Sequence, residues 1–433
     1  MLKKKKIVYV PLAADILHIG HLNILNTANK YGQVVVGLLT DKAIAEYKNI
    51  PLLSFDDRYK IIQNLKVVKN IIVQDTWDYS KILNKLKPDF FVHGDDWKKG
   101  KQEKTRKIVI KILKKNGGKL IEVPYTKNIS SFEIKNRIKE NFSNTSRVSL
   151  LKRMIEVKKM VRIIEAHSPL CGVIIENTIY KKNNINYEYN GMWSSSLTDS
   201  TLLGKPDNQS VDYSTRINGL NQIAAVTTKP IIFDIDNGGQ IEHLKFFIQD
   251  LERIGVSAIV MEDKIGLKQN SLFQNQSGVK QDSIEAFCKK IKVAKAATSN
   301  KDFLIIPRIE SFIVGKNAED ALKRAIAYSK AGSDCIMIHS KEDSPKQIFD
   351  FAKKFLKTKY ALPLVCVPST YSKTKEKDLI KNGFKVVIYA NQLMRASYKA
   401  MTIVAKKILI HTRAHEVEKE IMSVKEILHL IKQ

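Results

Sequence analysis

One stretch of this 433-residue chain brings acidic, basic and amide side chains together at a spacing that could bind an anionic, metal-bound substrate. A short apolar run, 258–261, is typical of a buried strand and ends at Glu262. A polar segment that holds Lys268 and Asn270 follows it. A carboxylate at a strand tip beside a loop lysine suits a divalent cation and a phosphoryl group. A solvated strand-end loop has the same pattern in isolation, so the other strand ends decide between the two interpretations.

A second stretch, near the start of the chain, places His18 and His21 three residues apart where a helix is expected to begin. Residues at this spacing share one face of a helix, and Gly20 between them permits close approach of the backbone. The positive end of the helix dipole favours an anion at this point. The pair therefore predicts a site for a polyphosphate, with two packed histidines at a helix start as the plain alternative.

The segments around the histidine pair alternate between strand and helix patterns. Continuous apolar runs at 7–10 and 34–39 are typical of strands that are covered on both faces. The pattern predicts a Rossmann-like, doubly wound α/β domain over residues 1–140, with ligands at the carboxyl ends of its parallel strands. Further strands of this domain are expected at 71–73, 90–92 and 120–123.

A polar, serine-rich segment, 141–150, is expected to link the first domain to a second one that covers residues 151–433. The second domain begins with a helical stretch, 151–166, and then alternates apolar runs with amphipathic stretches. This alternation predicts a TIM-type (β/α)8 barrel, whose chemistry lies where the strands end. The expected strands are 171–175, 191–193, 231–234, 258–262, 304–308, 335–339, 364–367 and 386–389.

The ends of these expected strands carry polar side chains of complementary kinds. Acidic residues follow strands three and four, and cationic or proton-donating residues follow strands five and six. Such a ring can hold a divalent cation, such as magnesium, on carboxylate oxygens and a phosphoryl group against an arginine. Because several strand ends converge, we interpret them as one site. The residues are Trp193, Ser195, Ser196, Asp234, Asp236, Glu262, Arg308, Glu310 and His339.

Composition argues against some classes of function. The formal net charge is +29, but the surplus is divided almost evenly between residues 1–150 and the remainder, which argues against a dedicated nucleic-acid-binding arm. A positive field of this kind favours anionic small substrates. The chain lacks a long apolar run, and its four cysteines have no CxxC spacing. We therefore expect a cytoplasmic protein with no nucleic-acid or membrane partner.

Residues 5–140 resemble the nucleotidylyltransferase superfamily, and within it the cytidylyltransferases that act on glycerol phosphate and ethanolamine phosphate. His18 and His21 match the HxGH motif of these enzymes. Leu12-Ala13-Ala14 replaces their usual glycine-threonine pair, and Phe132 replaces the threonine of their ISST motif. The resemblance implies CTP and magnesium, with His18 and His21 in catalysis. It implies nucleotide contacts from Asp15, His18, His21, Lys48, Arg58, His93, Asp95, Ser130 and Ser131.

Residues from about 150 to 433 resemble phosphoenolpyruvate mutase, in the isocitrate lyase superfamily. The resemblance rests on the EDK sequence at 262–264, on Asn270-Ser271 after it, and on GMWSSSL at 191–197. The cysteine-bearing KKCGH sequence of the lyases is absent. Asn237-Gly238-Gly239 and Ile265-Gly266-Leu267 depart from the residues that the mutases usually carry.

This second resemblance implies a role for each polar strand end. Asp234 would bind magnesium directly, and Asp236 and Glu262 would hold metal-bound waters. Lys268 and Asn270 would lie on a loop that closes over the substrate. The substrate-binding residues would be Trp193, Ser195, Ser196 and Leu197, and the catalytic residues Asp207, Lys268, Asn270, Arg308 and His339.

Together the two resemblances imply a bifunctional enzyme of phosphonate biosynthesis. The barrel would isomerise phosphoenolpyruvate to 3-phosphonopyruvate, and the first domain would transfer CMP from CTP to a phosphonate such as 2-aminoethylphosphonate. A homo-oligomer, dimer or tetramer, would form through the barrel. Two alternatives stay open: a barrel that hydrolyses phosphonopyruvate or cleaves a 2-oxo acid, and a first domain that acts on a phosphate ester or only binds a nucleotide.

Overall fold

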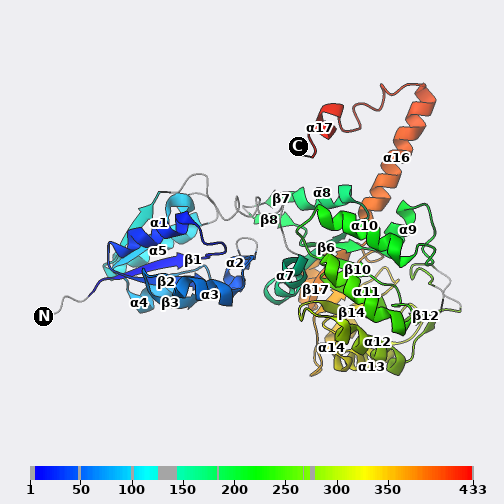
Figure 1. Cartoon of the computed structure of the whole chain (residues 1–433), viewed down its shortest axis with the longest axis horizontal. Helices are drawn as coiled ribbons and strands as arrows, with labels where there is room; N and C mark the ends of the chain where they lie inside the picture. The colour runs from blue at the N-terminus through cyan, green and yellow to red at the C-terminus, as the bar shows by residue number, and fades with distance from the viewer. Residues whose placement is uncertain are drawn as a thin grey trace.

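The computed structural model describes residues 5–46, 50–98, 102–124, 144–182, 185–266, 268–273 and 278–431. The chain forms a smaller N-terminal α/β body and a larger body built around a closed barrel (Figure 1). Both expected fold types, the Rossmann-like sheet and the TIM-type barrel, are therefore confirmed. None of the helices in the described ranges is long and apolar enough to span a bilayer.

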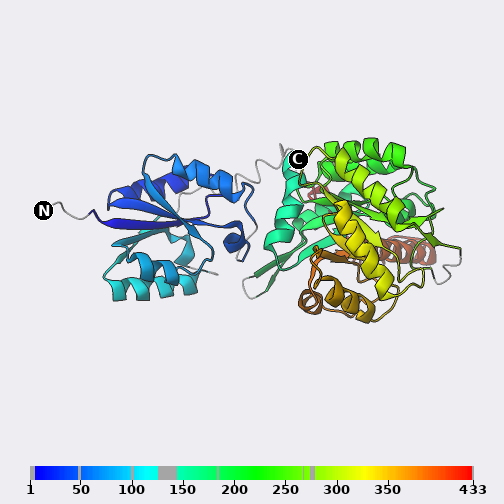
Figure 2. The same cartoon turned by 90° about the horizontal axis from the view of Figure 1, so that it is seen from below.

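Five parallel strands form the N-terminal sheet, in the order β3-β2-β1-β4-β5. Helices cover both of its faces, with α1 and α3 on one core cluster and α4 and α5 on the other (Figure 2). The strands are β1 (Ile7–Leu12), β2 (Gln33–Leu39), β3 (Val68–Gln74), β4 (Phe90–Gly94) and β5 (Lys119–Val123). The helices are α1 (Ile19–Asn29), α2 (Asp41–Ala45), α3 (Phe55–Gln63), α4 (Ser80–Leu86), the 3-10 helix η1 (Asp95–Lys98) and α5 (Glu103–Asn116).

The first strand lies in the middle of this sheet, with β2 and β3 on one side of it and β4 and β5 on the other. In doubly wound sheets, ligands bind outside the carboxyl ends of the strands at such a switch in strand order. β1 leads to α1 through His18, and β4 ends beside η1 after His93. Because β1 and β4 pair in parallel, the fold brings these two histidine-bearing segments to the same edge.

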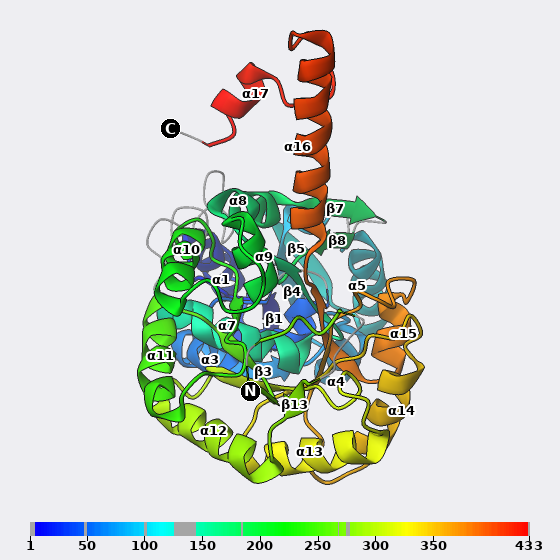
Figure 3. The same ribbon diagram turned by 90° about the vertical axis from the view of Figure 1, so that its right-hand side faces the viewer.

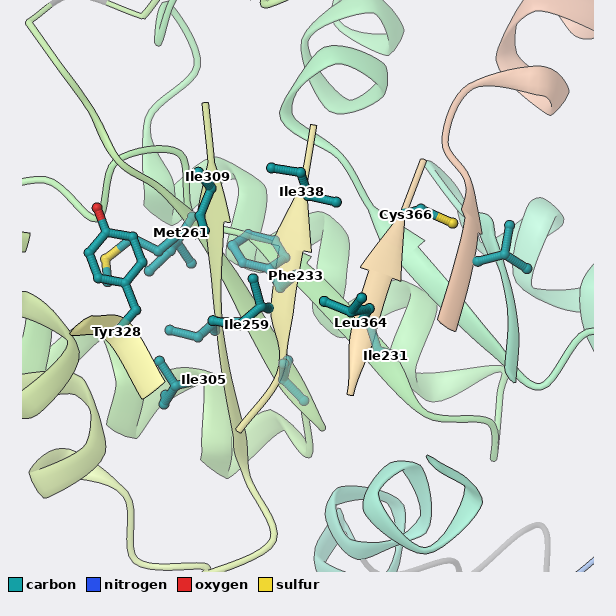
Figure 4. Close-up of a cluster of buried hydrophobic side chains, with 14 of the residues drawn as sticks. Ile231, Phe233, Ile259, Met261, Ile305, Ile309, Tyr328, Ile338, Leu364 and Cys366 are labelled. Carbon is teal, nitrogen blue, oxygen red and sulfur yellow. The ribbon is translucent and has the colours of Figure 1, made fainter. Parts of the chain in front are cut away.

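Eight parallel strands close into a barrel in the order β6-β9-β10-β11-β14-β15-β16-β17. Side chains alternate along them, so Ile232 and Val260 belong to the cluster inside the barrel. Phe233 and Ile259 belong to the cluster between strands and helices, part of which is shown in Figure 4. The strands are β6 (Val161–Glu165), β9 (Gly191–Ser194), β10 (Ile231–Asp234), β11 (Ala258–Glu262), β14 (Leu304–Ile309), β15 (Ile336–Ile338), β16 (Leu364–Cys366) and β17 (Phe384–Tyr389).

Helices surround the barrel, except for α16 and α17, which extend away from it, and two small hairpins are attached to the barrel (Figure 3). The helices are α8 (Pro169–Asn177), α9 (Ser196–Leu202), α10 (Tyr213–Ala225), α11 (Ile241–Ile254), α12 (Ile284–Ala297), α13 (Ala318–Ala331), α14 (Lys346–Phe355), α15 (Glu376–Lys381), α16 (Gln392–His411) and α17 (Val424–Leu428). The hairpins are β7 (Ile179–Lys182) with β8 (Ile185–Glu188), and β12 (Lys264–Ile265) with β13 (Lys280–Gln281).

Helix α7 (Asn144–Val157) precedes the first barrel strand and closes the amino-terminal end of the barrel. Its Leu151 and Ile155 are buried in the interior cluster together with Val161 and Ile163 of β6. In Figure 1, α7 lies on the side of the barrel that faces the N-terminal body. The strand ends that carry the polar residues therefore open at the opposite end of the barrel.

Three expected elements differ from the observed ones. Residues 171–175 lie in helix α8 and not in a strand, because Ser168 caps the backbone of Cys171 and Pro169 occupies the first helical turn. The first barrel strand is instead β6, inside the stretch expected to be helical to residue 166. Short apolar runs carry no periodicity that separates buried strand from buried helix. Residues 144–150, expected to be linker, belong to α7.

Helix α16 projects from the barrel (Figure 3), and Met394 is the only side chain of this helix that is buried. Apolar side chains along its length are exposed, among them Met401, Leu409 and Ile410. Contiguous exposed apolar surface of this kind is typical of a contact face between proteins.

Candidate active sites

A small cavity of about 60 Å³ lies at the carboxyl ends of the barrel strands. It brings together residues that are far apart in the sequence, from the end of β9 to the segment after β17. Residues singled out from the sequence that line it are Trp193, Ser195, Ser196, Leu197, Asp207, Asp234, Lys268, Asn270, Arg308 and His339. Asp236 and Glu262 lie directly behind them, in contact with Lys268 and Arg308 respectively.

The acidic wall of the cavity is formed by the end of β10. Oδ1 of Asp234 accepts a 3.0 Å hydrogen bond from the backbone N–H of Asp236, and Oδ2 accepts one of 3.3 Å from Ser196 Oγ. Burial raises the pKa of the Asp234 carboxyl, but Lys268 and Arg308 outweigh it and hold this pKa below its usual value. Asp236 has φ +52, in the left-handed region that non-glycine residues rarely adopt. Its backbone is thus held in a strained form beside the site.

Two cations face these carboxylates. Arg308 Nη1 lies 3.6 Å from Asp234 Oδ2, Nη2 contacts Glu262, and Nε donates to Glu310 Oε1 at 2.5 Å. Lys268 Nζ contacts Asp236 and lies 3.1 Å from Asp207 Oδ1. The cavity therefore has alternating charges, and each carboxylate that faces it has at least one cationic partner.

Glu310, to which the resemblance gives no role, holds the cationic wall in place. Its Oε1 accepts from Arg308 Nε and lies 3.1 Å from His339 Nδ1, and its Oε2 accepts from Ser271 Oγ at 2.9 Å. Burial would raise its pKa, but Arg308 and His339 outweigh burial and lower it. Because a carboxylate only accepts, His339 carries a proton on Nδ1 and presents Nε2 elsewhere. In the sequence, Glu310 lies two positions after Arg308, and side chains two positions apart along a strand point to the same face.

The segment with Lys268 and Asn270 is folded over the cavity. Asn270 Nδ2 donates to Asp207 Oδ2 at 2.7 Å. Lys264 Nζ donates to Gln269 O and to Ser271 Oγ, each at 2.8 Å. Asn270 and Ser271, which line the cavity, are thereby tied to the barrel, and the segment acts as a cover in this conformation.

The base of this cover is fixed by Asp263, which follows β11. Its Oδ2 accepts from Tyr328 Oη at 2.7 Å and from Gln281 Nε2 at 2.8 Å, and lies 3.3 Å from Arg324 Nη1. Burial raises the pKa of Asp263 to about 6, against the opposing effect of Tyr328 and Arg324. Since Gln281 lies on the returning strand β13, Asp263 joins both ends of the loop to α13.

Residues that were assigned no role from the sequence also shape the site. Arg216 of α10 is buried, with its Nε 2.9 Å from Asp199 Oδ2 and its Nη1 3.4 Å from Asp236 Oδ2. Ser369 and Asn391 line the cavity from the segments after β16 and β17. Ser369 and Asn391 follow expected strands and could have been found by that rule, whereas Arg216 lies within a helical pattern and gives no such signal.

The carboxylates fit a magnesium ion that is bound through one or two protein oxygens and through water. Within the described part of the chain, no three His, Cys, Asp or Glu side chains form a group that could hold a metal alone. Magnesium commonly keeps several waters and takes one or two carboxylates. Asp234 is ionised and lines the cavity. Glu262 shares the cation Arg308 with Asp234, and Asp236 lies near the cation Arg216. The donor chemistry therefore suits this ion.

In the N-terminal sheet, His18 and His21 cap the start of α1. His18 Nδ1 accepts from the backbone N–H of Gly20 at 3.1 Å, and His21 Nδ1 accepts from that of His18 at 3.4 Å. The two rings lie 4.0 Å apart between centroids. Burial lowers the pKa of His18. An Nδ1 that accepts leaves the proton of a neutral ring on Nε2, which suits a donor to an anion at a helix start.

Asp15 and Arg58 form contacts in the segment that leads to this histidine pair. Asp15 is buried, and its Oδ1 accepts from the backbone N–H of Leu52 at 2.5 Å and of Leu53 at 3.4 Å. Arg58 is fully buried and donates to Ala13 O at 2.5 Å. Asp15 therefore binds the backbone of residues 52–53, and Arg58 binds the backbone of the segment before the motif. Lys48, the other expected basic residue, lies outside the described residues.

The end of β4 supplies an aromatic platform near the same edge. The ring of His93 stacks on Trp97 at 4.0 Å between centroids, with 10° between the planes. Trp97 Nε1 donates to Glu122 Oε1 at 2.8 Å, which fixes the indole. Asp95 begins η1 directly after β4, with Oδ2 3.8 Å from Lys98 Nζ. Ser130 and Ser131 fall outside the described residues.

Two features define the class of this protein. One is a parallel eight-stranded barrel with paired carboxylates and cations at its strand ends, and the other is a Rossmann-like sheet with an HxGH motif at a helix start. The chain belongs to the phosphoenolpyruvate phosphomutase family, whose model matches residues 151–409. A cytidylyltransferase-like family model matches residues 13–137. Both resemblances drawn from the sequence are thus confirmed, and the chain carries two enzyme families in one polypeptide.

Individual relatives agree with this assignment. The phosphoenolpyruvate phosphomutase of Tetrahymena pyriformis is 34% identical over 296 residues, which are 68% of this chain and 94% of that protein. A crystal structure of phosphonopyruvate hydrolase with oxalate and Mg++ has 30% identity and a TM-score of 0.59, covering 67% of this chain and 95% of that one. The ethanolamine-phosphate cytidylyltransferase of Dictyostelium discoideum is 32% identical over 150 residues, 33% of this chain and 41% of that protein.

Proposed function

We propose that the barrel isomerises phosphoenolpyruvate to 3-phosphonopyruvate and that the N-terminal domain transfers CMP from CTP to a phosphonate. The observation that carries the first half is the cover over the cavity: Lys268 and Asn270 both reach Asp207 from the loop. Moving a phosphoryl group within one substrate requires that water be kept from it. A charge-alternating cavity that this loop covers meets this requirement, and the match to the mutase family supports it.

In this isomerisation the bond between phosphorus and the enol oxygen breaks, and a bond between phosphorus and the methylene carbon forms. No other reactant is consumed. Arg308 and His339 would neutralise the phosphoryl group as it moves, and Glu310 would hold both of them. Asp207 would face the group as nucleophile or positioning residue, because Lys268 and Asn270 each hold one of its oxygens.

The pyruvyl part would be held by Trp193, Ser195, Ser196 and Leu197, which line the same cavity. A magnesium ion on Asp234, with Asp236 and Glu262 through water, would supply Lewis-acid stabilisation of the enolate oxygens. Ser196 Oγ already donates to Asp234, which orients the carboxylate. The N-terminal site would also work with magnesium on its polyphosphate substrate.

A barrel that hydrolyses phosphonopyruvate is the second candidate. The similarity to a phosphonopyruvate hydrolase at 30% identity supports it. The two reactions share the same cavity groups and differ in whether water reaches the phosphoryl group. The full chain, given phosphoenolpyruvate, magnesium and a phosphonopyruvate decarboxylase as sink, should produce a carbon–phosphorus signal in phosphorus NMR. Absence of that signal would exclude the mutase.

In the N-terminal domain, an oxygen of the acceptor phosphonate would attack the α-phosphorus of CTP, and pyrophosphate would leave. His18 and His21 would donate to the departing phosphates from the start of α1. We propose 2-aminoethylphosphonate as the acceptor, with a phosphate ester or nucleotide binding alone as alternatives. His18→Ala should lower CTP-dependent pyrophosphate release about a hundredfold or more. The exposed His243 of α11 provides the control: His243→Ala should leave release unchanged.

The sequence divides the chain into a domain of residues 1–140, a linker of residues 141–150 and a barrel domain of residues 151–433; we also propose this division, with the barrel domain beginning at α7 (Asn144–Val157) instead of at residue 151. The two family models, which match residues 13–137 and 151–409, support this division. A homo-oligomer would bury the exposed apolar side chains of α16. Light scattering on the full chain measures the oligomeric state, and a monomer at micromolar concentration would exclude the oligomer.

A further inference from the structure

Helix α7, which closes the amino-terminal end of the barrel, also reaches the N-terminal domain through one side chain. Arg153 Nη1 donates to Leu52 O at 2.8 Å. Its Nη2 donates to Pro51 O at 2.9 Å, to Leu53 O at 3.2 Å and to Asp41 Oδ2 at 2.8 Å. One guanidinium group of the barrel domain thus holds three consecutive carbonyls and one carboxylate of the other domain. Charge-assisted bonds of this kind are stronger and more directional than neutral ones.

The same segment, residues 51–53, binds the region before the HxGH motif through backbone N–H groups. The backbone N–H groups of Leu52 and Leu53 donate to Asp15 Oδ1, and Asp15 lies three residues before His18. Arg153 therefore binds the carbonyl side of residues 51–53 while Asp15 binds the amide side. A shift of this segment would move Asp15 and the start of α1 with it.

A second chain of contacts runs from Arg153 to the same place. Asp41 accepts from Arg153 at Oδ2 and from Arg58 Nη2 at Oδ1, at 2.6 Å. Arg58 Nη1 donates to Ala13 O. The residue after it, Ala14, has φ +48, in the left-handed region. A non-glycine residue stays in this conformation only when its surroundings hold it, and the Arg58 contact supplies such support.

We propose that Arg153 is a positioning residue for the nucleotide site of the N-terminal domain, so that the barrel domain completes the cytidylyltransferase. This inference rests on the proposed cytidylyl transfer. Its two chains of contacts, through residues 51–53 and through Asp41 and Arg58, converge on the segment 13–15, which ends three residues before His18. The fusion of the two domains is then a structural requirement for the first reaction and not only a way to keep two enzymes together.

The first experiment compares Arg153→Ala, Arg153→Lys and Lys152→Ala in the full chain. Lys152 is the matched control, because it lies on the same helix but its Nζ contacts Asp302 of the barrel, at 3.0 Å. Arg153→Ala should lower kcat/KM for CTP about tenfold or more in pyrophosphate release. Arg153→Lys, which keeps the charge but not the planar fork, should restore only part of the loss. Isomerisation by the barrel should be unchanged in all three variants.

The second experiment follows hydrogen exchange of the Leu52 and Leu53 amides by mass spectrometry or NMR. Exchange should become faster in Arg153→Ala and stay at the native rate in Lys152→Ala. This measurement does not depend on catalysis, so it still tests the contact if the native chain releases no pyrophosphate. Absence of pyrophosphate release would overturn the proposed transferase and not the contact. Unchanged exchange, or faster exchange with an unchanged kcat/KM, would overturn the positioning role. Added guanidinium ion that restores activity to Arg153→Ala would support it.

Discussion

Asn270 donates a hydrogen bond of 2.7 Å from Nδ2 to Oδ2 of Asp207, and this bond joins the loop over the barrel cavity to a residue of its wall. Lys268 of the same loop holds the other oxygen, Oδ1, at 3.1 Å. The orientation of the Asp207 carboxylate is therefore set by the loop. Closing the cavity and aligning Asp207 are one event in this geometry.

Removing the amide of Asn270 should uncouple these two functions. Asn270→Ala is expected to lower kcat of the isomerisation about a hundredfold, because a carboxylate displaced by about 1 Å no longer faces the phosphoryl group. The share of phosphonopyruvate that ends as pyruvate and orthophosphate should rise, since water gains access. Phosphorus NMR measures both products. Asn208→Ala, next to Asp207 but exposed, is the control, and an equal effect there would contradict the account.

Glu310 should matter for folding as well as for catalysis. Its side chain is fully buried between Arg308 and His339, and removing one partner of a buried pair costs about 3–5 kcal/mol. Glu310→Gln is expected to destabilise the barrel by this order, measured from its urea unfolding transition. Glu319→Gln, whose carboxylate pairs with Lys354 at the surface, should change stability little. A barrel of native stability in Glu310→Gln would show that Arg308 does not need its partner.

The two aspartates at the end of β10 should differ in their effect on metal dependence. Isomerisation should stop when a chelator removes magnesium and return when the ion is added back. Asp236→Asn is expected to weaken apparent magnesium affinity about tenfold to a hundredfold, as loss of an outer ligand does. Asp234→Asn, which loses the direct ligand, should weaken it further. Activity titrations against magnesium measure this order, and the reverse order would exchange the proposed roles.

The barrel should lose stability as the pH rises above neutrality. Burial lowers the pKa of His167, but contacts with Cys171 and Glu165 outweigh it and raise this pKa from 6.5 to about 9. A raised histidine pKa contributes stability that is complete below about 6.5 and is lost as the pH rises through about 9. Although burial opposes this, the contact with His167 also lowers the pKa of the Cys171 thiol, and that offsets part of the loss. Thermal unfolding of the native chain should show the remainder as a falling barrel Tm between these values.

Two variants test the source of this pH dependence. His167→Asn should flatten the profile, because the titrating group is gone. His243→Asn, at an exposed position of α11, should keep it. Glu165 also accepts from the backbone N–H of Leu393 and Met394, so the start of α16 should loosen over the same pH range. A profile that His167→Asn leaves unchanged would assign the dependence to another group.

The sequence predicted both folds and most of the barrel site because parallel strands end at one edge. Asp234, Arg308 and His339 each follow a separate apolar run, and the barrel brings them to one cavity, with Glu262 directly behind Arg308. The pattern of apolar residues predicted the wrong element where an apolar run is too short to distinguish a strand from a helix. The apolar stretch at 171–175 is as short as a strand, and only the capping by Ser168 and Pro169 makes it helical.

Contacts between distant segments were not predictable in the same way. Arg58 matched a basic position of the cytidylyltransferases, yet it is fully buried and holds the backbone of Ala13. Arg216 and Arg153 lie in ordinary helical patterns, and their partners are known only once α10 and α7 are placed in space. Charge and spacing show which residues could act, but the partner of a long side chain depends on tertiary packing.

The direct test of the central claim runs the barrel reaction from the phosphonate side. The full chain is given 3-phosphonopyruvate and magnesium, and phosphorus NMR follows the products without added coupling enzymes. The account predicts that the carbon–phosphorus signal is replaced by that of phosphoenolpyruvate, with little orthophosphate, because Lys268 and Asn270 cover the cavity. Orthophosphate and pyruvate without phosphoenolpyruvate would contradict it and make the barrel a hydrolase.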